Sequence, residues 1–460
     1  MTNLAYHVAE MTKAVRRRHL RDARVPVLTP PSRATGWLGV FARSPLTVLD
    51  RANDVADVVR FRIAYRDVYL VNEPRAIGHV LFDNDDNYRR GQQSHGELRR
   101  VLGPGMLTAD DDEWERYRRL AQPSFRDARL AAVSACIDRL APSLLERWAQ
   151  AARDGRELLL GPETMRMTVR IAAEAFFQYR LDDGRAYRFF DALMLSQTDA
   201  FTRAVSLRTA LFPFRPRPQS PVGAAYRFLR QLCEDIADSA AASQDDYLGD
   251  LRAPGAGLER EVLLAQIMTM LVSAPENPSN LLTFALFLLG TRPELERQAR
   301  DEVRAVFGDQ PVTSAGLRQL VLLRAIIQET LRLYPGAWGF ERMAIADDEV
   351  GGYRIRAGST VLLSPYAMHR NPRHWDRPLV FDPARFLEPQ VERHRFAYFP
   401  FGGGKRTCIG NRLAETLGLH LLASLLQRFR ITPTSAELPR LAALFTLRPA
   451  GPVKVRVSAI

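Results

Sequence analysis

Apolar residues recur every three or four positions along most of this chain, which is the pattern of helices that bury one face. The segments in which this pattern is clearest are 141–152, 164–178, 222–243, 261–290, 292–307, 315–334 and 411–430. Alternation with a period of two, which is typical of strands, is clearest at 58–71 and 350–363. The pattern predicts a mainly helical fold with a small β region.

Connections rich in proline and glycine lie at 25–36, 212–222 and 371–389, and none is long or polar enough for a flexible linker between domains. We therefore expect residues 1–460 to form a single domain, in which the first 25 residues could be flexible. The N-terminal stretch also lacks an apolar run near the ~20 residues that a membrane span needs, so we expect no transmembrane anchor.

The composition, 46% hydrophobic and 25% charged, is that of a folded globular protein. The three cysteines are an odd number, which argues against a disulfide framework and favours a reducing compartment, the cytoplasm. There are 64 basic and 52 acidic residues, a net charge of +12. Because the arginines are scattered, with no zinc-finger spacing, RNP-like strand or basic arm, we expect an acidic protein partner and no nucleic acid.

The segment from Phe401 to Gly410 reads FGGGKRTCIG and places a cysteine after three glycines and two cations. A cysteine acts as a metal ligand or nucleophile only as the thiolate, which is favoured by nearby cations, a helix N-terminus or a metal. Lys405 and Arg406 supply cations, and the helical pattern that begins at Gly410 supplies a helix N-terminus. The residues alone also leave open a buried structural cysteine, or a Cys-His nucleophile for which no histidine stands out.

The spacing F-x-x-G-x-R-x-C-x-G, completed by Cys408, resembles the haem-binding loop of the cytochrome P450 superfamily. The resemblance implies haem b as the cofactor, with Cys408 as the axial ligand of its iron. The loop and helix positions that it places around the cofactor are Phe401, Gly402, Arg406, Gly410 and Ala414. Among them, Arg406 would bind a haem propionate and Ala414 would let the following helix lie close to the ring. The fold implied is that family's triangular prism of helices.

Two further stretches are similar to family motifs. Glu329 and Arg332 form an E-x-x-R pair on one helix face, although alone such a pair is an ordinary salt bridge. The segment FDPARF at 381–386 resembles the family's meander, so the resemblance places Arg385 with that pair in a buried triad. Ala384 stands where the family usually has glutamate.

Trp114 and Arg118 form a W-x-x-x-R motif, in which an indole and a guanidinium lie one helical turn apart. Such a pair could be a surface cation–π contact. The resemblance instead implies that both bind haem propionates, together with Arg342 and Arg406. Guanidinium groups suit this role because their paired donors match a carboxylate.

The apolar segment 266–290 carries the main departure from the family. The oxygen-activating motif falls on SAPEN at 273–277, so the acid is kept as Glu276 whereas Asn277 replaces the usual threonine. Pro275 and Pro278 each remove a backbone donor, at a cost of about 3 kcal/mol in a regular helix. We therefore expect the helix to kink or open here, although proline kinks also occur without a chemical role.

Oxygen activation consumes protons, and an asparagine amide can donate a hydrogen bond but cannot relay a proton as a hydroxyl does. We hypothesise that protons travel through Glu276 and ordered water, through Ser273 or Ser279, or through a hydroxyl on the substrate.

The resemblance places the substrate among residues 92–108, 190–222, 270–279, 336–340 and 444–446. The candidate contacts are Ala274, Trp338, Phe340 and Phe445. Their apolar character predicts a lipophilic substrate such as a terpenoid, polyketide or aromatic intermediate of secondary metabolism.

The predicted activity is that of a haem-thiolate monooxygenase that oxidises or hydroxylates such a substrate with O₂. No flavin- or iron–sulfur-binding segment is present, so electrons would come from an acidic ferredoxin or flavodoxin that docks near Arg116, Arg119, Lys405 and Arg412. The missing threonine leaves open a haem enzyme without the usual oxygen activation, namely an isomerase, a dehydratase or a peroxygenase. A catalytically silent helical binding protein is the alternative of another class.

Overall fold

The computed structural model describes residues 25–206, 217–239, 246–387, 393–437 and 439–460. Two sequence-based expectations fall outside these residues. They are the flexible N-terminal segment, of which 1–24 are not described, and part of the expected substrate region, 207–216.

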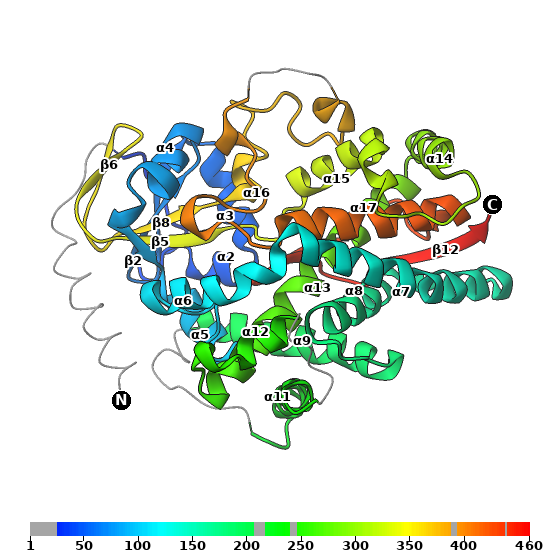
Figure 1. Cartoon of the computed structure of the whole chain (residues 1–460). Helices are drawn as coiled ribbons and strands as arrows, with labels where there is room; N and C mark the ends of the chain where they lie inside the picture. The colour runs from blue at the N-terminus through cyan, green and yellow to red at the C-terminus, as the bar shows by residue number, and fades with distance from the viewer. Residues whose placement is uncertain (1–24, 207–216, 240–245, 388–392, 438) are drawn as a thin grey trace.

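Helices dominate the described chain, and the longest fill one side of the molecule (Figure 1). The α-helices are α2 (Leu38–Arg43), α3 (Pro45–Asn53), α4 (Pro74–Gly78), α5 (Gln92–Leu102), α6 (Asp111–Ala121), α7 (Asp127–Asp154), α8 (Leu160–Phe177), α9 (Asp183–Ala204), α11 (Pro221–Ala237), α12 (Tyr247–Arg252), α13 (Arg260–Gly290), α14 (Pro293–Phe307), α15 (Val321–Leu333), α16 (Pro365–Met368) and α17 (Asn411–Arg428). Short helical turns are η1 (His79–Asp83), η2 (Asp85–Asn87), η3 (Gln122–Phe125), η4 (Pro254–Ala256), η5 (Gly316–Gln319), η6 (Pro383–Phe386), η7 (Arg395–Ala397) and η8 (Gly404–Arg406). The mainly helical fold predicted from the apolar spacing is confirmed. Within the described ranges, no helix combines the length and apolar character that crossing a bilayer requires.

The strands form small sheets, of which the largest has the order β1-β2-β8-β5-β3 and lies beside the helices (Figure 1). The strands are β1 (Val58–Ile63), β2 (Arg66–Val71), β3 (Tyr88–Arg90), β4 (Leu158–Leu159), β5 (Phe340–Ala344), β6 (Asp348–Val350), β7 (Tyr353–Ile355), β8 (Thr360–Leu363), β9 (Phe429–Pro433), β10 (Leu441–Ala443), β11 (Leu447–Pro449) and β12 (Lys454–Ala459). β1 and β2 are the hairpin predicted at 58–71. β8 pairs in parallel with β2 and antiparallel with β5, whose other neighbour β3 brings Arg90 opposite Arg342.

Helix α13 passes through the core and packs against α8, α11 and α17. Most of its side chains are buried, as its apolar sequence predicted. The polar side chains that face α8 are paired across the interface, where Thr164 Oγ1 lies 2.9 Å from Ser279 Oγ and 3.0 Å from Thr283 Oγ1. Ser279 is therefore engaged in a helix–helix contact.

The two prolines do not interrupt α13, which keeps helical backbone from Arg260 to Gly290. Of the two effects expected at Pro275 and Pro278, an opening of the helix is therefore wrong, whereas a kink stays a prediction. Each proline removes one intrahelical hydrogen bond, but the segment is buried against several neighbouring helices. Most helical stability in proteins comes from such packing, so here it outweighs local propensity.

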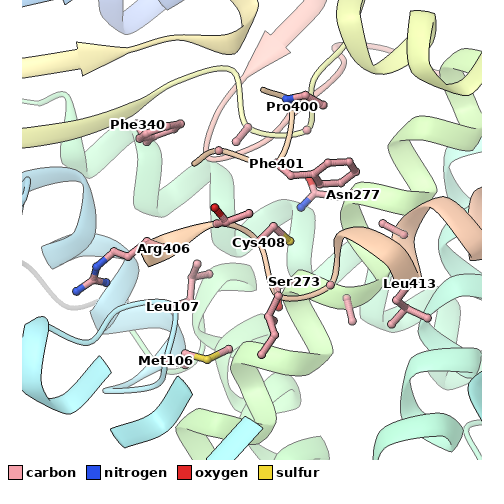
Figure 2. A pocket seen from close by; sticks show the side chains of 18 of the residues that line it. Met106, Leu107, Ser273, Asn277, Phe340, Pro400, Phe401, Arg406, Cys408 and Leu413 are labelled. Atoms are coloured by element: carbon pink, nitrogen blue, oxygen red, sulfur yellow. The ribbon is translucent and has the colours of Figure 1, made fainter. Parts of the chain in front are cut away.

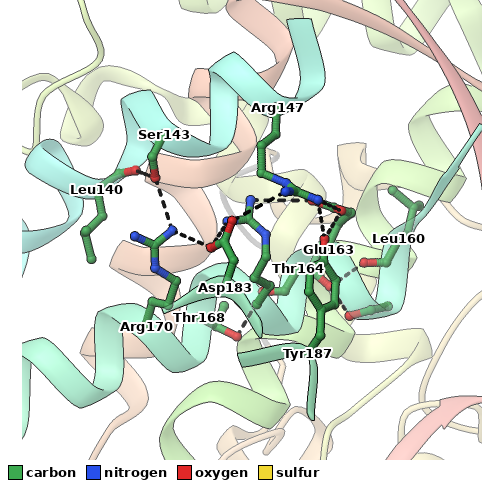
Figure 3. A network of polar contacts seen from close by, with 12 residues as sticks. Leu140, Ser143, Arg147, Leu160, Glu163, Thr164, Thr168, Arg170, Asp183 and Tyr187 are labelled. Carbon is green, nitrogen blue, oxygen red and sulfur yellow. Dashed lines mark hydrogen bonds and ion pairs between the residues drawn. The ribbon is translucent and has the colours of Figure 1, made fainter. Parts of the chain in front are cut away.

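An ion-pair network joins α7, α8 and α9 (Figure 3). Asp183, at the start of α9, accepts hydrogen bonds from Arg166 Nη1 at 2.8 Å and from Arg170 Nη1 at 2.9 Å. Arg166 is fully buried, and it also meets Glu163, which in turn pairs with Arg147 of α7. The network fixes the first turn of α9, whose later residues line a cavity described below.

Pro275 offers a test of how strongly packing maintains α13. We expect Pro275→Ala to raise the free energy of unfolding by about 1 kcal/mol, because the ~3 kcal/mol helix penalty of proline exceeds the lost ring packing and the added entropy of the unfolded chain. Pro142, exposed inside α7, is the matched control, and Pro142→Ala should gain about 2 kcal/mol because no packing is lost. Chemical denaturation measures both. A loss of stability confined to Pro275→Ala would contradict the expectation.

Candidate functional site

Cys408 lies in a tight loop between η8 and α17. Its backbone N–H donates to the Phe401 carbonyl at 2.9 Å, and Thr407 Oγ1 donates to the Gly404 carbonyl at 2.8 Å. Gly404 has a φ of +69°, and a Cβ at this position would lie 1.8 Å from the carbonyl oxygen of Leu81, so only glycine fits. The loop is therefore held against η1, which fixes the position of the cysteine.

The Cys408 side chain has surface exposed to an internal cavity, although the protein surrounds it. Burial raises the pKa of its thiol, whereas the Gly410 N–H and the Arg118 guanidinium act in the opposite direction. Gly410 is the N-cap of α17, so the predicted helix N-terminus does face the sulfur. Burial outweighs these contributions, so the thiolate in this loop would need a further positive centre such as a metal.

The cavity has a volume of about 330 Å³ and lies between α6, α13, α17 and the strand β5 (Figure 2). Its walls are mostly apolar. The apolar side chains that line it include Met106, Leu107, Phe125, Leu281 and Leu413. Of the residues expected around the cofactor or substrate, those that line it are Trp114, Arg118, Ala274, Phe340, Arg342, Phe401, Gly402, Arg406, Cys408, Gly410 and Ala414. The structure thus brings together residues from five separate stretches of the sequence.

Four guanidinium groups, those of Arg90, Arg118, Arg342 and Arg406, and one indole lie along the same cavity. The Trp114 ring has Arg406 Cζ 4.5 Å and Arg118 Cζ 5.9 Å from its centroid. Arg406 Nη1 also donates to the Ala109 carbonyl at 3.4 Å. Arg342 approaches from β5, where it stacks at 5.1 Å on the Phe340 ring.

These residues fit haem, as the surroundings of Arg118 show. Burial lowers the pKa of this side chain, and it has no carboxylate partner among the described residues. A desolvated cation without an anion is costly, so a bound carboxylate would stabilise it. Haem offers a flat apolar ring for the apolar walls, carboxylates for the guanidinium groups and a metal for the Cys408 sulfur.

The triad behind the loop is also assembled. Glu329 and Arg332 are fully buried on α15 and share two hydrogen bonds, from Arg332 Nε at 2.7 Å and from Nη2 at 2.8 Å. Arg385 of η6 comes within 3.5 Å of Glu329 through its Nε. Arg332 also donates to three backbone carbonyls of the segment 369–380. The pair thereby ties α15 to the chain that leads to η6.

The α13 residues expected to handle protons face three different directions. Ser273 and Asn277 line the cavity next to Cys408 (Figure 2). Ser273 Oγ donates to the Thr269 carbonyl at 2.6 Å. Glu276 lines a second cavity and not the first, and Ser279 lines neither because it faces α8. The structure therefore does not bring Ser279 together with the others.

Asn277 is accommodated by a glycine. A Cβ at Gly336 would lie 2.3 Å from Asn277 Oδ1, so any larger residue there would displace the amide. Asn277 Oδ1 is buried without a hydrogen-bond partner among the described residues. The Asn277 amide is thus packed closely against the 336–337 segment at the point where the two cavities meet.

Glu276 is bound by two neutral donors from distant parts of the chain. Gln197 Nε2 of α9 donates to Glu276 Oε2 at 2.6 Å, and Thr446 Oγ1, between β10 and β11, donates to Oε1 at 2.5 Å. Burial raises the pKa of Glu276, while Thr446, the Arg448 charge and Gln197 oppose this effect. The carboxyl group is therefore directed into a polar cluster and away from Cys408.

The second cavity, of about 350 Å³, contains the other expected substrate contacts, Trp338 and Phe445. Trp338 Nε1 already donates to the Leu444 carbonyl at 2.7 Å, so the ring offers the cavity an apolar face. Phe445 meets Phe201 edge to face with ring centroids 6.1 Å apart. The cavity shares Ser273, Asn277 and other residues with the first, so the two adjoin at these residues.

Arg90 and Gln197 are among the cavity residues that were not singled out in the sequence, although Gln197 falls within the expected substrate region 190–222. Arg90 lines both cavities, opposite Arg342 in the sheet, but no local pattern reveals that pairing. Gln197 could have been found, because it is the polar member of a buried helical stripe with Leu193 and Phe201.

The cations expected to receive an electron donor are mostly engaged within the protein. Lys405 and Arg412 pair with aspartates at 2.6 and 2.5 Å, and Arg116 donates to backbone carbonyls of η4 and the residue after it. Arg119 is exposed. These contacts reduce the positive charge that this face presents.

Comparison with known proteins gives one family. Residues 44–457 match the family model described as Cytochrome P450. The chain is 31% identical to cyclooctatin synthase of Streptomyces melanosporofaciens, over 95% of this chain and 96% of that protein. It is 28% identical to cyclooctat-9-en-7-ol 5-monooxygenase of the same organism, over 85% and 86% of the two chains. It is also 28% identical to pentalenene oxygenase of Streptomyces avermitilis, over 91% and 93%.

The triad geometry predicts unequal roles for its two arginines. We expect Arg332→Ala to destabilise the protein by about 3–5 kcal/mol and to abolish haem retention, because Glu329 would stay buried without its bidentate partner. Arg385→Ala should cost less and retain part of the haem, because Arg332 still binds both carboxylate oxygens. Haem content per purified chain measures the difference. Equal losses in the two variants would contradict this ranking.

Proposed function

The chain belongs to the cytochrome P450 family, and from this premise we propose that it is a monooxygenase that hydroxylates a cyclic terpenoid. It is an oxidoreductase whose cofactor is haem b. The observation that most directly supports the proposal is the Cys408 sulfur, which faces a mostly apolar cavity that adjoins a second one. The names of relatives that oxidise terpenes, pentalenene oxygenase among them, support the substrate class.

In this proposal Cys408 ligates the haem iron, while Trp114, Arg118, Arg342 and Arg406 bind the propionates. When bound, haem supplies the iron centre at which O₂ is reduced and one oxygen atom is transferred to a C–H bond. Overall, O₂, two electrons and two protons convert that C–H bond to C–OH, and the second oxygen atom leaves as water. The guanidinium groups fix the ring by paired hydrogen bonds to its carboxylates.

The substrate would occupy the second cavity and extend, past the residues common to both cavities, toward the first cavity, which would hold the haem. Trp338, Phe201 and Phe445 present ring faces and edges that exclude water and suit a rigid hydrocarbon skeleton. Ala274 and Phe340 border the point at which the skeleton meets the haem. A strongly hydrated substrate would lose its hydration against these aromatic rings without recovering it from them.

Asn277 donates from its amide into the space beside Cys408, in place of the family's alcohol. Because the amide cannot relay a proton, the Ser273 hydroxyl, Glu276 with ordered water, or a substrate hydroxyl supplies protons to this space. Electrons come from an external acidic protein, a ferredoxin or flavodoxin, that docks near Arg119.

The role of Cys408 as the ligand of the haem iron can be tested directly. We expect the purified, reduced protein to give a thiolate-type Soret band with carbon monoxide, and Cys408→Ser to lose it because an alcohol is a much weaker ligand than a thiolate. Cys136→Ser, at a buried cysteine far along the chain, is the control and should retain the band. Absence of the band with Cys408 intact would overturn the proposal.

A peroxide-using enzyme is the second candidate, and the replacement of the relaying hydroxyl by Asn277 favours it. Feeding hydrogen peroxide alone, or O₂ with a reduced ferredoxin, separates the two. Product formed only in the second case supports the monooxygenase.

We expect asparagine to fill the space at position 277 better than threonine would. We expect Asn277→Thr to lower the fraction of electrons that end in product by roughly threefold or more, because the smaller side chain leaves space against Gly336 that admits water. The measurement is product formed per reductant consumed. Ser279→Ala, on the same helix but facing α8, should leave this ratio unchanged. Unchanged or better coupling in Asn277→Thr would refute the idea that asparagine is an adaptation of this site.

A further inference from the structure

The wall of the second cavity is mostly apolar, with polar side chains in two groups. One group comprises Tyr65, Arg66, Arg90, Ser206, Ser273, Asn277 and Glu341, and the other comprises three residues that are linked by hydrogen bonds. Gln197, Glu276 and Thr446 line the cavity together, and they come from α9, α13 and the turn between β10 and β11. Gln197 and Glu276 are almost completely buried, at 3% and 2% exposure. We call these three residues the polar wall. The apolar part of the wall, which includes Phe41, Leu98 and Trp338, cannot form hydrogen bonds with a ligand through its hydrocarbon faces.

The polar wall has more capacity to accept hydrogen bonds than to donate them. One N–H of Gln197 and the hydroxyl hydrogen of Thr446 are both directed at the Glu276 carboxylate. Each Glu276 oxygen accepts one hydrogen bond from these groups, and a carboxylate offers about four acceptor positions. Unused acceptor positions therefore remain beside the cavity.

Arg448 does not satisfy these positions from within the protein. Its Nη1 lies 3.5 Å from Gln197 Oε1 and its Nη2 lies 3.4 Å from Thr198 Oγ1. Arg448 does not line the cavity, so it sits behind the polar wall and contributes charge without direct hydrogen bonding to Glu276 among the described contacts. Its charge opposes the effect of burial, which raises the pKa of Glu276, and thereby favours the ionised form that accepts hydrogen bonds.

A pure hydrocarbon would be a poor occupant of such a cavity. It would displace water from the Glu276 carboxylate and return no hydrogen bond, which leaves a buried charged acceptor less satisfied. A ligand hydroxyl would restore the lost bond as a charge-assisted one, which is stronger than a bond between neutral groups. A ketone would not, because it has no hydrogen to donate.

We propose that the substrate already carries a hydroxyl group, which donates to the Glu276 carboxylate while the carbon skeleton extends past Ser273 and Asn277 toward Cys408. This inference rests on the proposed function and specifies its substrate as a terpenoid alcohol. The polar wall selects and orients the substrate, so that the C–H bond to be oxidised is remote from the existing oxygen. The product is then a diol.

The inference also indicates where the reaction stands in the order of biosynthetic steps. A terpene hydrocarbon does not carry oxygen, so the alcohol must come from an earlier step. That step is either a hydroxylation of the hydrocarbon or a cyclisation in which water captures the final carbocation. The present enzyme would act after it.

Ligand binding tests the inference without turnover. The probes are three compounds with one fused-ring terpene skeleton: the hydrocarbon, a secondary alcohol and the corresponding ketone. Each is titrated into the ferric, haem-loaded protein at pH 8, and dissociation constants are read from the spin-state shift and from calorimetry. We expect the alcohol to bind about tenfold more tightly than either of the other two.

Two variants test whether the polar wall causes the preference for the alcohol over the hydrocarbon. In Glu276→Met the alcohol and the hydrocarbon should bind within about twofold of each other, because the acceptor is gone. In Thr446→Val the preference for the alcohol should be kept or increased, because Glu276 loses a donor and depends more on the ligand. Ser279→Ala is the control on the same helix and should keep the wild-type ratio. A purely structural role for the cluster would change stability in both variants and leave the ratio unaltered.

The outcomes separate this inference from the proposed function. Equal binding of alcohol and hydrocarbon to the wild-type protein overturns the inference and leaves the terpenoid monooxygenase in place. A ketone bound as tightly as the alcohol also overturns it, because a donor is then not required. If none of the three compounds binds to protein that shows the thiolate band, both the inference and the terpenoid assignment fail.

Discussion

The structure around the cavity depends on the Cys408 sulfur, which must be held at the cavity wall and stabilised as a thiolate. Its loop is closed by the hydrogen bond from the Cys408 N–H to the Phe401 carbonyl and packs against Leu81 at Gly404, so the backbone that carries the sulfur is held at the cavity wall. Burial disfavours charge on this sulfur, and the N-terminus of α17 and Arg118 offset only part of that effect. A thiolate here is therefore stable beside a metal, and the surrounding apolar walls and guanidinium groups suit the macrocycle that would carry it.

Short motifs could be placed from the sequence because helix geometry fixes their members relative to one another. Glu329 and Arg332 are three residues apart and share a face, and Trp114 and Arg118 are four apart. The contact of Arg385 with Glu329 joins distant segments, and only the family resemblance suggested it. The unbroken course of α13 through its prolines could not be predicted, because it depends on packing against α8, α11 and α17, which no local pattern encodes.

Helix α13 divides its chemistry between two cavities by simple geometry. Consecutive residues on an α-helix are rotated by about 100°, so Asn277 can face Cys408 while its neighbour Glu276 faces away from it. The sequence showed both residues but not the separation, because the partners of Glu276 come from α9 and from the turn between β10 and β11. A motif that reads as one catalytic unit is thus two sites in space.

The turn between β10 and β11 contributes Phe445 and Thr446 to the second cavity but nothing to the cavity of Cys408. It belongs to a two-stranded sheet formed by residues that are close in sequence. Mutations in this short hairpin could therefore alter which substrates bind. The cysteine loop, the triad of Glu329, Arg332 and Arg385, and the arginines that line the first cavity would stay intact. Evolution can therefore change the substrate specificity of this fold through substitutions in one hairpin, while the protein keeps its cofactor.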